Sequence, residues 1–204
     1  MSRSTDADSR VEILDHSEAY SGYFELARYR LRHRKHAGGW TPPLVREVLN
    51  RGHTVALLPY DPLRDTVVLI EQFRIGAYAA GLEPWQVEAV AGVIEPGEEA
   101  GDVARREAME EAGCEVGELE AIGAVLLSSG ASSETSHMFC GRVSSDGVGG
   151  VHGLAHEGED IRAIVVPALE AIARLRDTAA ISAYTVIPLQ WLAINRQRLR
   201  AQWT

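Results

Sequence analysis

The sequence GVIEPGEEAGDVARREAMEEAGC, residues 92–114, is the stretch that decides the fold of this chain. Its EPG triplet at 95–97 is typical of a turn, and the acidic residues Glu98 and Glu99 that follow suit the N-terminus of a helix. Residues 104–112 are mostly good helix formers, and Gly113 can end the helix in a left-handed conformation. We therefore expect a turn followed by a helix that stops at Gly113.

Three carboxylates gather on one face of this expected helix. Glu107 and Glu111 lie one above the other because residues four apart share a face, and Glu110 lies beside them. Like charges at this spacing repel, and Arg106 can neutralise at most one of them. A hard divalent cation, Mg²⁺ with Mn²⁺ as a substitute, prefers several oxygen ligands and accepts a substrate phosphate as well. A solvated acidic face is the alternative, and the EE pair alone would favour it.

The fixed positions of the stretch resemble the Nudix box, the signature of hydrolases that split nucleoside diphosphates linked to another moiety. The matching residues are Gly92, Glu98, Arg106, Glu107, Glu110, Glu111 and Gly113. A chance match at seven such positions is on the order of 10⁻⁸ for each starting point. Ala108 and Cys114 depart from the usual form, which has bulkier aliphatic residues there, so we expect slightly weaker packing at both.

Composition limits the classes of partner. The chain has 204 residues, 46% of them hydrophobic, which suits one domain with an elaboration and a substantial core. A net charge of −9 disfavours nucleic acid or an anionic membrane as the main partner. No apolar run approaches the roughly 18 residues that cross a bilayer. Two cysteines, Cys114 and Cys140, indicate a reducing compartment, so we expect a cytoplasmic protein.

The residues RYRLRHRK at 28–35 form the one basic cluster. Their alternating arginines predict a strand with a solvated or dimer-facing side, and nucleic-acid binding is the less favoured alternative. The HAGGW segment at 36–40 predicts a turn that closes this strand against the next one.

Hydrophobic patterns predict a chain of strands around the acidic helix, and therefore an α/β sandwich. The expected strands span residues 11–15, 23–34, 44–49, 53–60, 66–73, 85–90, 119–127, 135–143 and 160–166, with a hairpin at DPLRD, residues 61–65. Two helices are expected at 168–176 and 183–202. The second contains Pro188, which predicts that it starts or kinks there.

The resemblance extends well beyond the box. The segments RGH at 51–53, IEQFR at 70–74, VAG at 90–92 and HGLAHEGEDIR at 152–162 are similar to those of bacterial ADP-ribose pyrophosphatases, as is the C-terminal segment. The resemblance covers about residues 11–204. It implies a Nudix α/β/α sandwich at 51–204, preceded by a small β domain at 11–50 that is exchanged between the subunits of a homodimer. Residues 1–10 are polar, so we expect a disordered N-terminus there.

The same resemblance implies the catalytic and substrate-binding residues. The metal ligands would be the carbonyl of Ala91 and the carboxylates of Glu107, Glu111 and Glu159, and the catalytic base would be Glu157. His152 and His156 would be loop residues and not metal ligands, because the other donors are oxygens. Stacking suits aromatic rings to an adenine site, and a guanidinium fork suits phosphate oxygens. The substrate-binding residues would be Tyr23, Phe24, Arg46, Glu47, Arg74, Val93, Ser128, Ser129, Gly130 and Glu134.

One position bears on specificity. ADP-ribose pyrophosphatases usually carry a proline where this chain has Ser129, and serine allows a less rigid loop. The resemblance implies Mg²⁺-dependent hydrolysis of ADP-ribose to AMP and ribose 5-phosphate. The alternatives are hydrolysis of another nucleoside diphosphate sugar such as GDP-mannose, and a non-catalytic ADP-ribose sensor. A sensor should have lost box carboxylates or the base, whereas Glu107, Glu110, Glu111 and Glu157 are all present.

Overall fold

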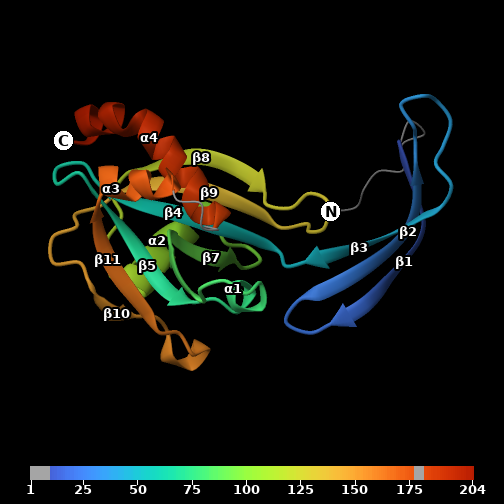
Figure 1. Cartoon of the computed structure of the whole chain (residues 1–204), viewed down its shortest axis with the longest axis horizontal. Coiled ribbons are helices and arrows are strands. Elements are labelled where there is room, and N and C mark those ends of the chain that lie inside the picture. The colour runs from blue at the N-terminus through green and yellow to red at the C-terminus, as the bar shows by residue number, and fades with distance from the viewer. Residues whose placement is uncertain (1–9, 177–181) are drawn as a thin grey trace. The chain divides into compact units, whose positions relative to one another are not determined.

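The computed structural model describes residues 10–176 and 182–204, which form two compact units (Figure 1). The N-terminal unit comprises residues 1–52 together with 126–134, and the main unit comprises 53–125 and 135–204. The N-terminal domain expected at residues 11–50 did not include segment 126–134, which is distant in sequence. The disordered segment expected at 1–10 lies, except for Arg10, outside the described residues.

The main unit is built on a mixed sheet. Its spatial strand order is β10-β11-β5-β4-β9-β8, with β6 added to β5 and β7 added to β4. The strands are β4 (His53–Asp61), β5 (Thr66–Phe73), β6 (Trp85–Glu88), β7 (Val90–Ile94), β8 (Leu119–Leu126), β9 (Thr135–Arg142), β10 (Gly150–His152) and β11 (Ile161–Pro167). β4 and β9 run parallel, whereas the pairs that β5 makes with β4, β6 and β11 are antiparallel.

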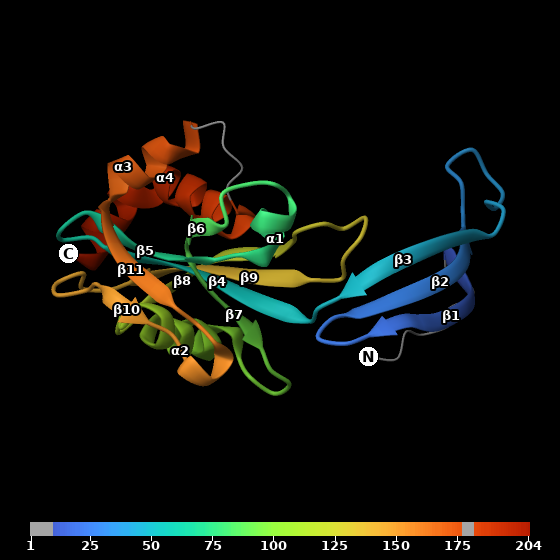
Figure 2. The same cartoon turned by 60° about the horizontal axis from the view of Figure 1, so that its bottom comes forward.

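Helices cover both faces of this sheet, as Figure 2 shows. The box helix α2 (Ala100–Ala112) lies on one face, and α3 (Ala168–Ala173) and α4 (Ala183–Trp203) lie on the other. Short helices α1 (Ile75–Ala79), η1 (Ala155–Glu157) and η2 (Arg174–Arg176) complete the unit. The predicted α/β sandwich is therefore confirmed. Among the described residues, no helix is long and apolar enough to cross a membrane.

The central strand β4 explains why there are two cores. Val55 and Leu57 pack into the core under α2, whereas Leu58 and Tyr60 pack into the core under α4. Because successive side chains point to opposite faces, a strand covered on both sides must be apolar throughout. Ala108 on α2 is fully buried, so the small residue lies inside a closely packed interface.

The segment predicted as one strand at 85–90 is two strands, so that prediction is wrong. β4 and β5 pair only through Tyr60–Val67 and Asp61–Thr66 and then diverge. β6 pairs with β5, whereas β7 pairs with β4, and the chain changes its pairing partner at Ala89. One straight strand cannot pair with two strands that separate. Strand β10 and helix α1 were not predicted, and α4 begins at Ala183, so the helix does not start at Pro188.

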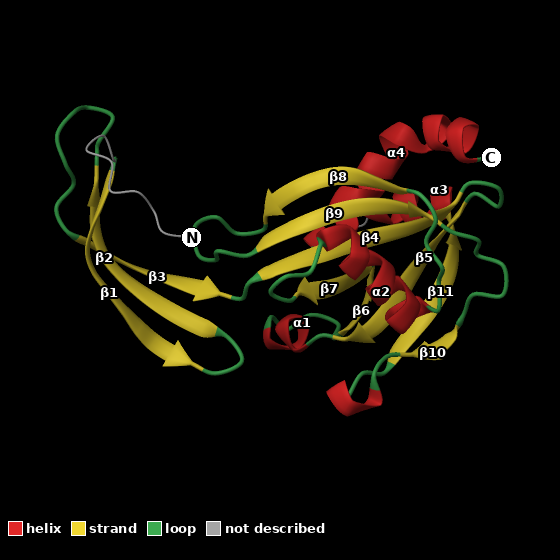
Figure 3. Ribbon diagram, turned by 180° about the vertical axis from the view of Figure 1, so that it is seen from behind, coloured by secondary structure: helices red, strands yellow, loops and turns green. Residues whose placement is uncertain are grey.

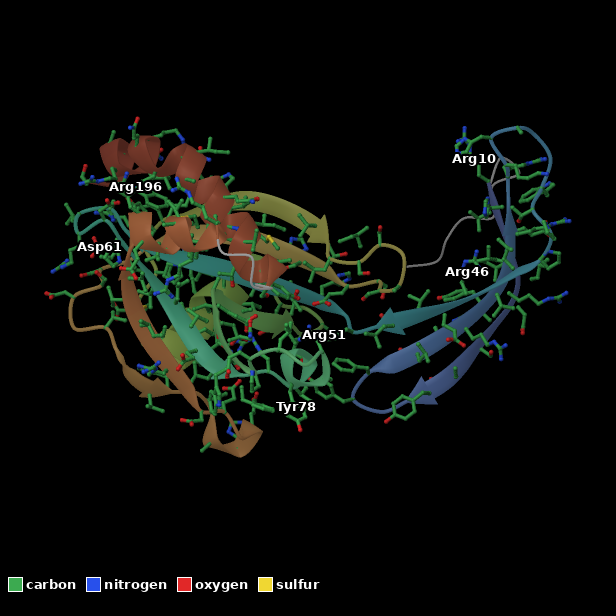
Figure 4. The ribbon with its side chains drawn as sticks, viewed as in Figure 1. Arg10, Arg46, Arg51, Asp61, Tyr78 and Arg196 are labelled. Atoms are coloured by element: carbon green, nitrogen blue, oxygen red, sulfur yellow. The ribbon has the colours of Figure 1, made fainter. Side chains whose placement is uncertain are left out.

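The turn between β4 and β5 is held by buried Asp61 and partly buried Asp65, and Asp65 binds Arg196 of α4; Figure 4 labels Asp61 and Arg196. Burial opposes charge on Asp61, but hydrogen bonds from the backbone of Arg64 and Ser145 prevail and lower its pKa to about 2. Asp65 accepts hydrogen bonds from Tyr60 Oη at 2.8 Å and from Arg196 Nε at 2.6 Å. The turn therefore anchors α4 to the sheet.

The N-terminal unit is a three-stranded antiparallel sheet of β1 (Val11–Ser21), β2 (Glu25–His33) and β3 (Leu44–Asn50), seen from behind in Figure 3. Segment 126–134 joins it, since Leu49 N donates to Ala131 O at 2.8 Å. None of residues 10–52 is fully buried. We predicted Tyr23 and Phe24 in a strand. That is wrong, because they lie in the turn between β1 and β2.

The basic cluster on β2 is a strand, as predicted, and acidic residues lie opposite two of its arginines. The register places Arg28 opposite Glu47 and Arg32 opposite Glu12, and Arg32 forms an ion pair with Glu12 at 2.7 Å. The predicted turn at 36–40 brings the Trp40 ring to 4.3 Å from the Arg34 guanidinium carbon. Pairing of this kind favours a folded sheet face over a nucleic-acid surface.

Candidate active site

The site begins where β7 passes the box helix. A side chain at Gly92 would place its Cβ 1.9 Å from Oε1 of Glu107, so only glycine leaves room for that carboxylate. Glu111 is 3% exposed, and its Oε2 accepts a hydrogen bond from Ala91 N at 3.0 Å. The spacing between the glycine and the glutamates therefore lets α2 press two carboxylates against the backbone of β7.

The two carboxylates resist ionisation. Burial, with a smaller contribution from neighbouring acids that include Glu159, raises the pKa of Glu107 to about 7 and that of Glu111 to about 8. Arg106 opposes the shift at Glu107, and the Ala91 N–H opposes it at Glu111. Desolvation and repulsion between like charges both favour the protonated acid.

Arg106 is shared among three acids. Its guanidinium lies 2.9 Å from Glu107, 2.9 Å from Glu110 and 3.6 Å from Glu98. Arg74 adds a second positive charge that acts on Glu111, but two arginines cannot balance these three carboxylates together with Glu111 and Glu159. The site therefore keeps an uncompensated negative charge that a cation would relieve.

The loop after β10 carries the other predicted acids. Glu159 Oε2 accepts a hydrogen bond from Leu154 N at 2.9 Å, and Glu159 is one of the acids that raise the pKa of both box carboxylates. The side chain of Glu157 is 56% exposed, and its Oε1 lies 3.5 Å from His156 Nε2. The structure thus brings Glu159 to the box, while Glu157 lies outside it on the same loop. His152 Nε2 contacts Gly149 O at 2.9 Å.

Two buried polar residues at the site were missed from the sequence. Glu88 on β6 is 6% exposed and accepts a hydrogen bond from Arg74 Nε at 2.6 Å. Gln72 on β5 is 8% exposed, and its Nε2 lies 3.4 Å from Glu111 Oε1. The sequence signal that could have revealed Gln72 and Glu88 is a polar residue in a strand that also carries buried apolar residues. A polar residue in such a strand is buried only where it has a hydrogen-bond partner.

The predicted residues fall into both units. Ala91, Glu107, Glu111, Glu157 and Glu159 lie in the main unit, as do Arg74 and Val93. Tyr23, Phe24, Arg46, Glu47, Ser128, Ser129, Gly130 and Glu134 lie in the N-terminal unit. The aromatic pair is T-shaped, with ring centroids 4.8 Å apart. Arg46 and Glu47 are exposed on β3, and Ser128 O accepts hydrogen bonds from Ala131 N and Ser132 N.

Arg51 is a further residue of the N-terminal unit that the sequence did not single out (Figure 4). Its guanidinium carbon lies 5.8 Å from the Phe24 ring centroid, and its Nη1 donates to buried Glu134 at 3.1 Å. Within the described part of the chain, no acceptor lies within hydrogen-bond distance of its buried Nε. Phe24, Arg51 and Glu134 therefore form one connected group.

The donor set suits a hard cation. Among residues 10–176 and 182–204, no three His, Cys, Asp or Glu side chains are arranged to hold a metal ion. Arg106, Gln72 and backbone N–H groups contact the carboxylates instead. The donors that Glu107, Glu111 and Glu159 offer are oxygens, however, and their negative charge is only partly compensated. An oxygen-only set with surplus negative charge fits Mg²⁺ or Mn²⁺ better than a softer metal.

Comparison with known proteins identifies the family. The family model of the NUDIX domain matches residues 50–190. The chain belongs to the Nudix family. The ADP-ribose pyrophosphatase of Escherichia coli (strain K12) is 46% identical to this Nudix chain over 193 residues, which cover 95% of this chain and 92% of the relative. The ADP-ribose pyrophosphatase of Haemophilus influenzae is 40% identical over 196 residues, covering 95% and 90%.

More distant matches agree on the fold. A GDP-mannose pyrophosphatase of Citrobacter koseri is 34% identical over 152 residues, which cover 72% of this chain and 76% of the relative. A crystal structure of an ADP compounds hydrolase superposes with a TM-score of 0.69 at 20% identity, covering 94% of this Nudix chain and 98% of its own. At that identity the likeness concerns the fold alone.

The raised pKa values of Glu107 and Glu111 predict how a cation acts on stability. The folded metal-free protein binds more protons than the unfolded chain above about pH 4.5, so its stability falls as pH rises through about 7 to 8. A cation replaces those protons, and its effect should therefore grow with pH. With Mg²⁺ at about 100 times its Kd, we expect Tm to rise by about 5–10 °C at pH 8. Scanning fluorimetry from pH 6 to 9 measures this.

Two variants serve as test and control. Glu111→Gln removes a buried charge, so it should stabilise the metal-free protein at pH 8 and lose the Mg²⁺-induced rise in Tm. Glu170→Gln, on the exposed face of α3, should keep it. A Mg²⁺ effect independent of pH, or a full effect in Glu111→Gln, would contradict the assignment.

Proposed function

We propose that this Nudix protein hydrolyses the diphosphate bond of ADP-ribose to AMP and ribose 5-phosphate with a divalent cation, Mg²⁺ in the cell. The observation that carries the proposal is the pair of poorly compensated carboxylates on the box helix, partly buried Glu107 and buried Glu111. Relatives named for this activity align over 95% of the chain, which supports the choice of substrate.

The ligands of the cation would be the Ala91 carbonyl, Glu107, Glu111 and Glu159. When bound, the cation neutralises charge on the diphosphate and lowers the pKa of water. The Ala91 N–H donates to one carboxylate oxygen of Glu111 and the Gln72 amide donates to the other, so the carboxylate has one orientation. Such support from neighbouring hydrogen bonds orients ligands in metal sites generally.

Glu157 would be the base that accepts a proton from the attacking water. Its side chain is half-exposed on a short 3₁₀ turn, and Gly158 follows it with a positive φ of 72°. A carboxylate can accept a proton from a water molecule that lies within hydrogen-bond reach. Arg74 would bind diphosphate oxygens, because its fork keeps N–H donors beyond the one used by Glu88.

The N-terminal unit would bind the nucleoside end. Tyr23 and Phe24 offer faces for stacking adenine, and Tyr23 is 85% exposed. Arg46, Glu47, Val93, Glu134 and the loop Ser128–Gly130 would line the rest of the substrate. Arg51 joins this set in our proposal because it contacts both Phe24 and Glu134.

We further propose a homodimer in which the N-terminal units are exchanged. The three-stranded sheet has no buried residue of its own between 10 and 52, and it exposes apolar side chains such as Val11, Ile13 and Tyr20. A small sheet needs a covered apolar face for stability. A second copy would supply that cover.

The free, buried thiols of Cys114 and Cys140 suit a reducing cytoplasm, which is where we place the protein.

A hydrolysis panel tests the substrate. With Mg²⁺, kcat/KM should be highest for ADP-ribose among ADP-ribose, GDP-mannose, NADH and dinucleoside polyphosphates. Ser129 is the specific reason to include GDP-mannose, because this loop lacks the stiffening proline. Ser129→Pro should shift the preference further toward ADP-ribose. A higher kcat/KM for GDP-mannose would overturn the substrate, and no hydrolysis of any compound would favour a sensor.

Replacing the proposed base should separate chemistry from binding. Glu157→Gln should lower kcat by about 10²–10³-fold, because general bases contribute on that scale, and should leave Mn²⁺ affinity within about twofold. Glu170→Gln controls for loss of one exposed acid. An unchanged kcat would move the base elsewhere, and a large loss of Mn²⁺ affinity would make Glu157 a ligand.

Subunit complementation tests the exchange. A variant carrying Tyr23→Ala and Phe24→Ala keeps the carboxylates, and Glu107→Gln keeps the aromatic pair, so each alone should be nearly inactive. If units are exchanged, unfolding and refolding an equal mixture should restore about a quarter of wild-type activity, since half the dimers are mixed and each has one intact site. Light scattering should show a dimer. A monomer, or a mixture without regained activity, would contradict the proposal.

A further inference from the structure

The break between β6 and β7 leaves a buried backbone N–H without a strand partner. Ala89 is fully buried, and it lies between Glu88, which pairs with Ile70 of β5, and Val90, which pairs with Leu57 of β4. A buried N–H that lacks an acceptor costs about 1–3 kcal/mol. Some other group must therefore accept a hydrogen bond from Ala89.

That acceptor is Thr185, from the first turn of α4. Its Oγ1 lies 3.0 Å from Ala89 N, and the side chain is 2% exposed. The neighbouring Tyr184 Oη lies 3.0 Å from Thr54 Oγ1, and Thr54 pairs with Val93 of β7. The first turn of α4 is thus hydrogen-bonded both to Ala89 at the strand break and to Thr54 of β4.

Ala89 and Ala91 lie two residues apart, one at the strand break and one in β7, and each donates its N–H to a side chain of a helix. Thr185 of α4 receives the first, and Glu111 of α2 receives the second. The helices that supply these acceptors lie on opposite faces of the sheet (Figure 2). The position of Ala91, which contacts Glu111 by its N–H, therefore depends on where Thr185 holds the chain two residues earlier.

We propose that Thr185 is a positioning residue for the cation site: its hydroxyl fixes the strand break so that Ala91 and Gly92 meet Glu111 and Glu107. The inference rests on the proposed metal site and adds a residue about 75 positions beyond the box. It assigns to α4 a role in ligand geometry besides its role in covering the sheet.

Three threonine variants test the inference. Thr185→Val keeps shape and removes the acceptor, Thr185→Ser keeps the hydroxyl, and Thr66→Val removes a hydroxyl that contacts Ser145 Oγ at 2.8 Å near the β4–β5 turn. Calorimetry should show Mn²⁺ affinity about tenfold weaker in Thr185→Val, the scale of outer-shell effects. Thr185→Ser and Thr66→Val should stay within about twofold of wild type. The kcat of Thr185→Val at saturating Mn²⁺ should recover.

The following outcomes would overturn either the positioning role of Thr185 or the metal site on which it rests. Equal Mn²⁺ affinities in Thr185→Val and Thr66→Val would overturn the positioning role, even if both lose stability. Wild-type protein that binds no Mn²⁺, or Glu111→Gln that binds it normally, would overturn the metal site itself. If Thr185→Val does not fold, amide exchange in wild type decides, because coupling is reciprocal. Mg²⁺ should then slow exchange of Ala89 N–H but not of Ser145 N–H, and equal effects on both would refute the inference.

Discussion

The structure depends on the contact between α2 and the backbone of β7. Gly92 leaves space for Glu107, and Ala91 donates its N–H to Glu111, so one partly buried and one buried acid lie where they resist ionisation. Burying acids in this way costs stability, since desolvation and mutual repulsion both oppose charge. The two cores around the central sheet supply the stability that tolerates this cost.

The divergence of β4 and β5 makes that contact possible. Because the two strands separate after the turn, β6 and β7 can enter the sheet between them and bring the box residues beside α2. Asp61 and Asp65 hold the strands together at the closed end, and Asp65 ties the same end to α4 through Arg196. The polar groups of the site therefore lie at the end of the sheet opposite this fastened turn.

Much of the site could be predicted from the sequence, because the box helix is local. Helical spacing alone places Glu107, Glu110 and Glu111 on one face, and the structure agrees. The residues missed were Gln72, Glu88, Arg51 and Thr185, all of which act on partners distant in the chain. Their partners are 14 to 96 positions away, so no local period could reveal them. Tyr23 and Phe24 were predicted in a strand because aromatic residues favour strands, yet a turn holds them.

The sequence by itself determined the family, the acidic helix and the α/β class of the fold, because each depends on motif spacing or on the periodicity of single elements. Only the tertiary structure decided that the predicted strand at 85–90 divides at Ala89 and that α4 satisfies the break. Only it showed that one arginine, Arg106, serves three acids. The physical reason is that hydrogen bonds and charges act through space, and folding alone sets which distant groups come within their reach.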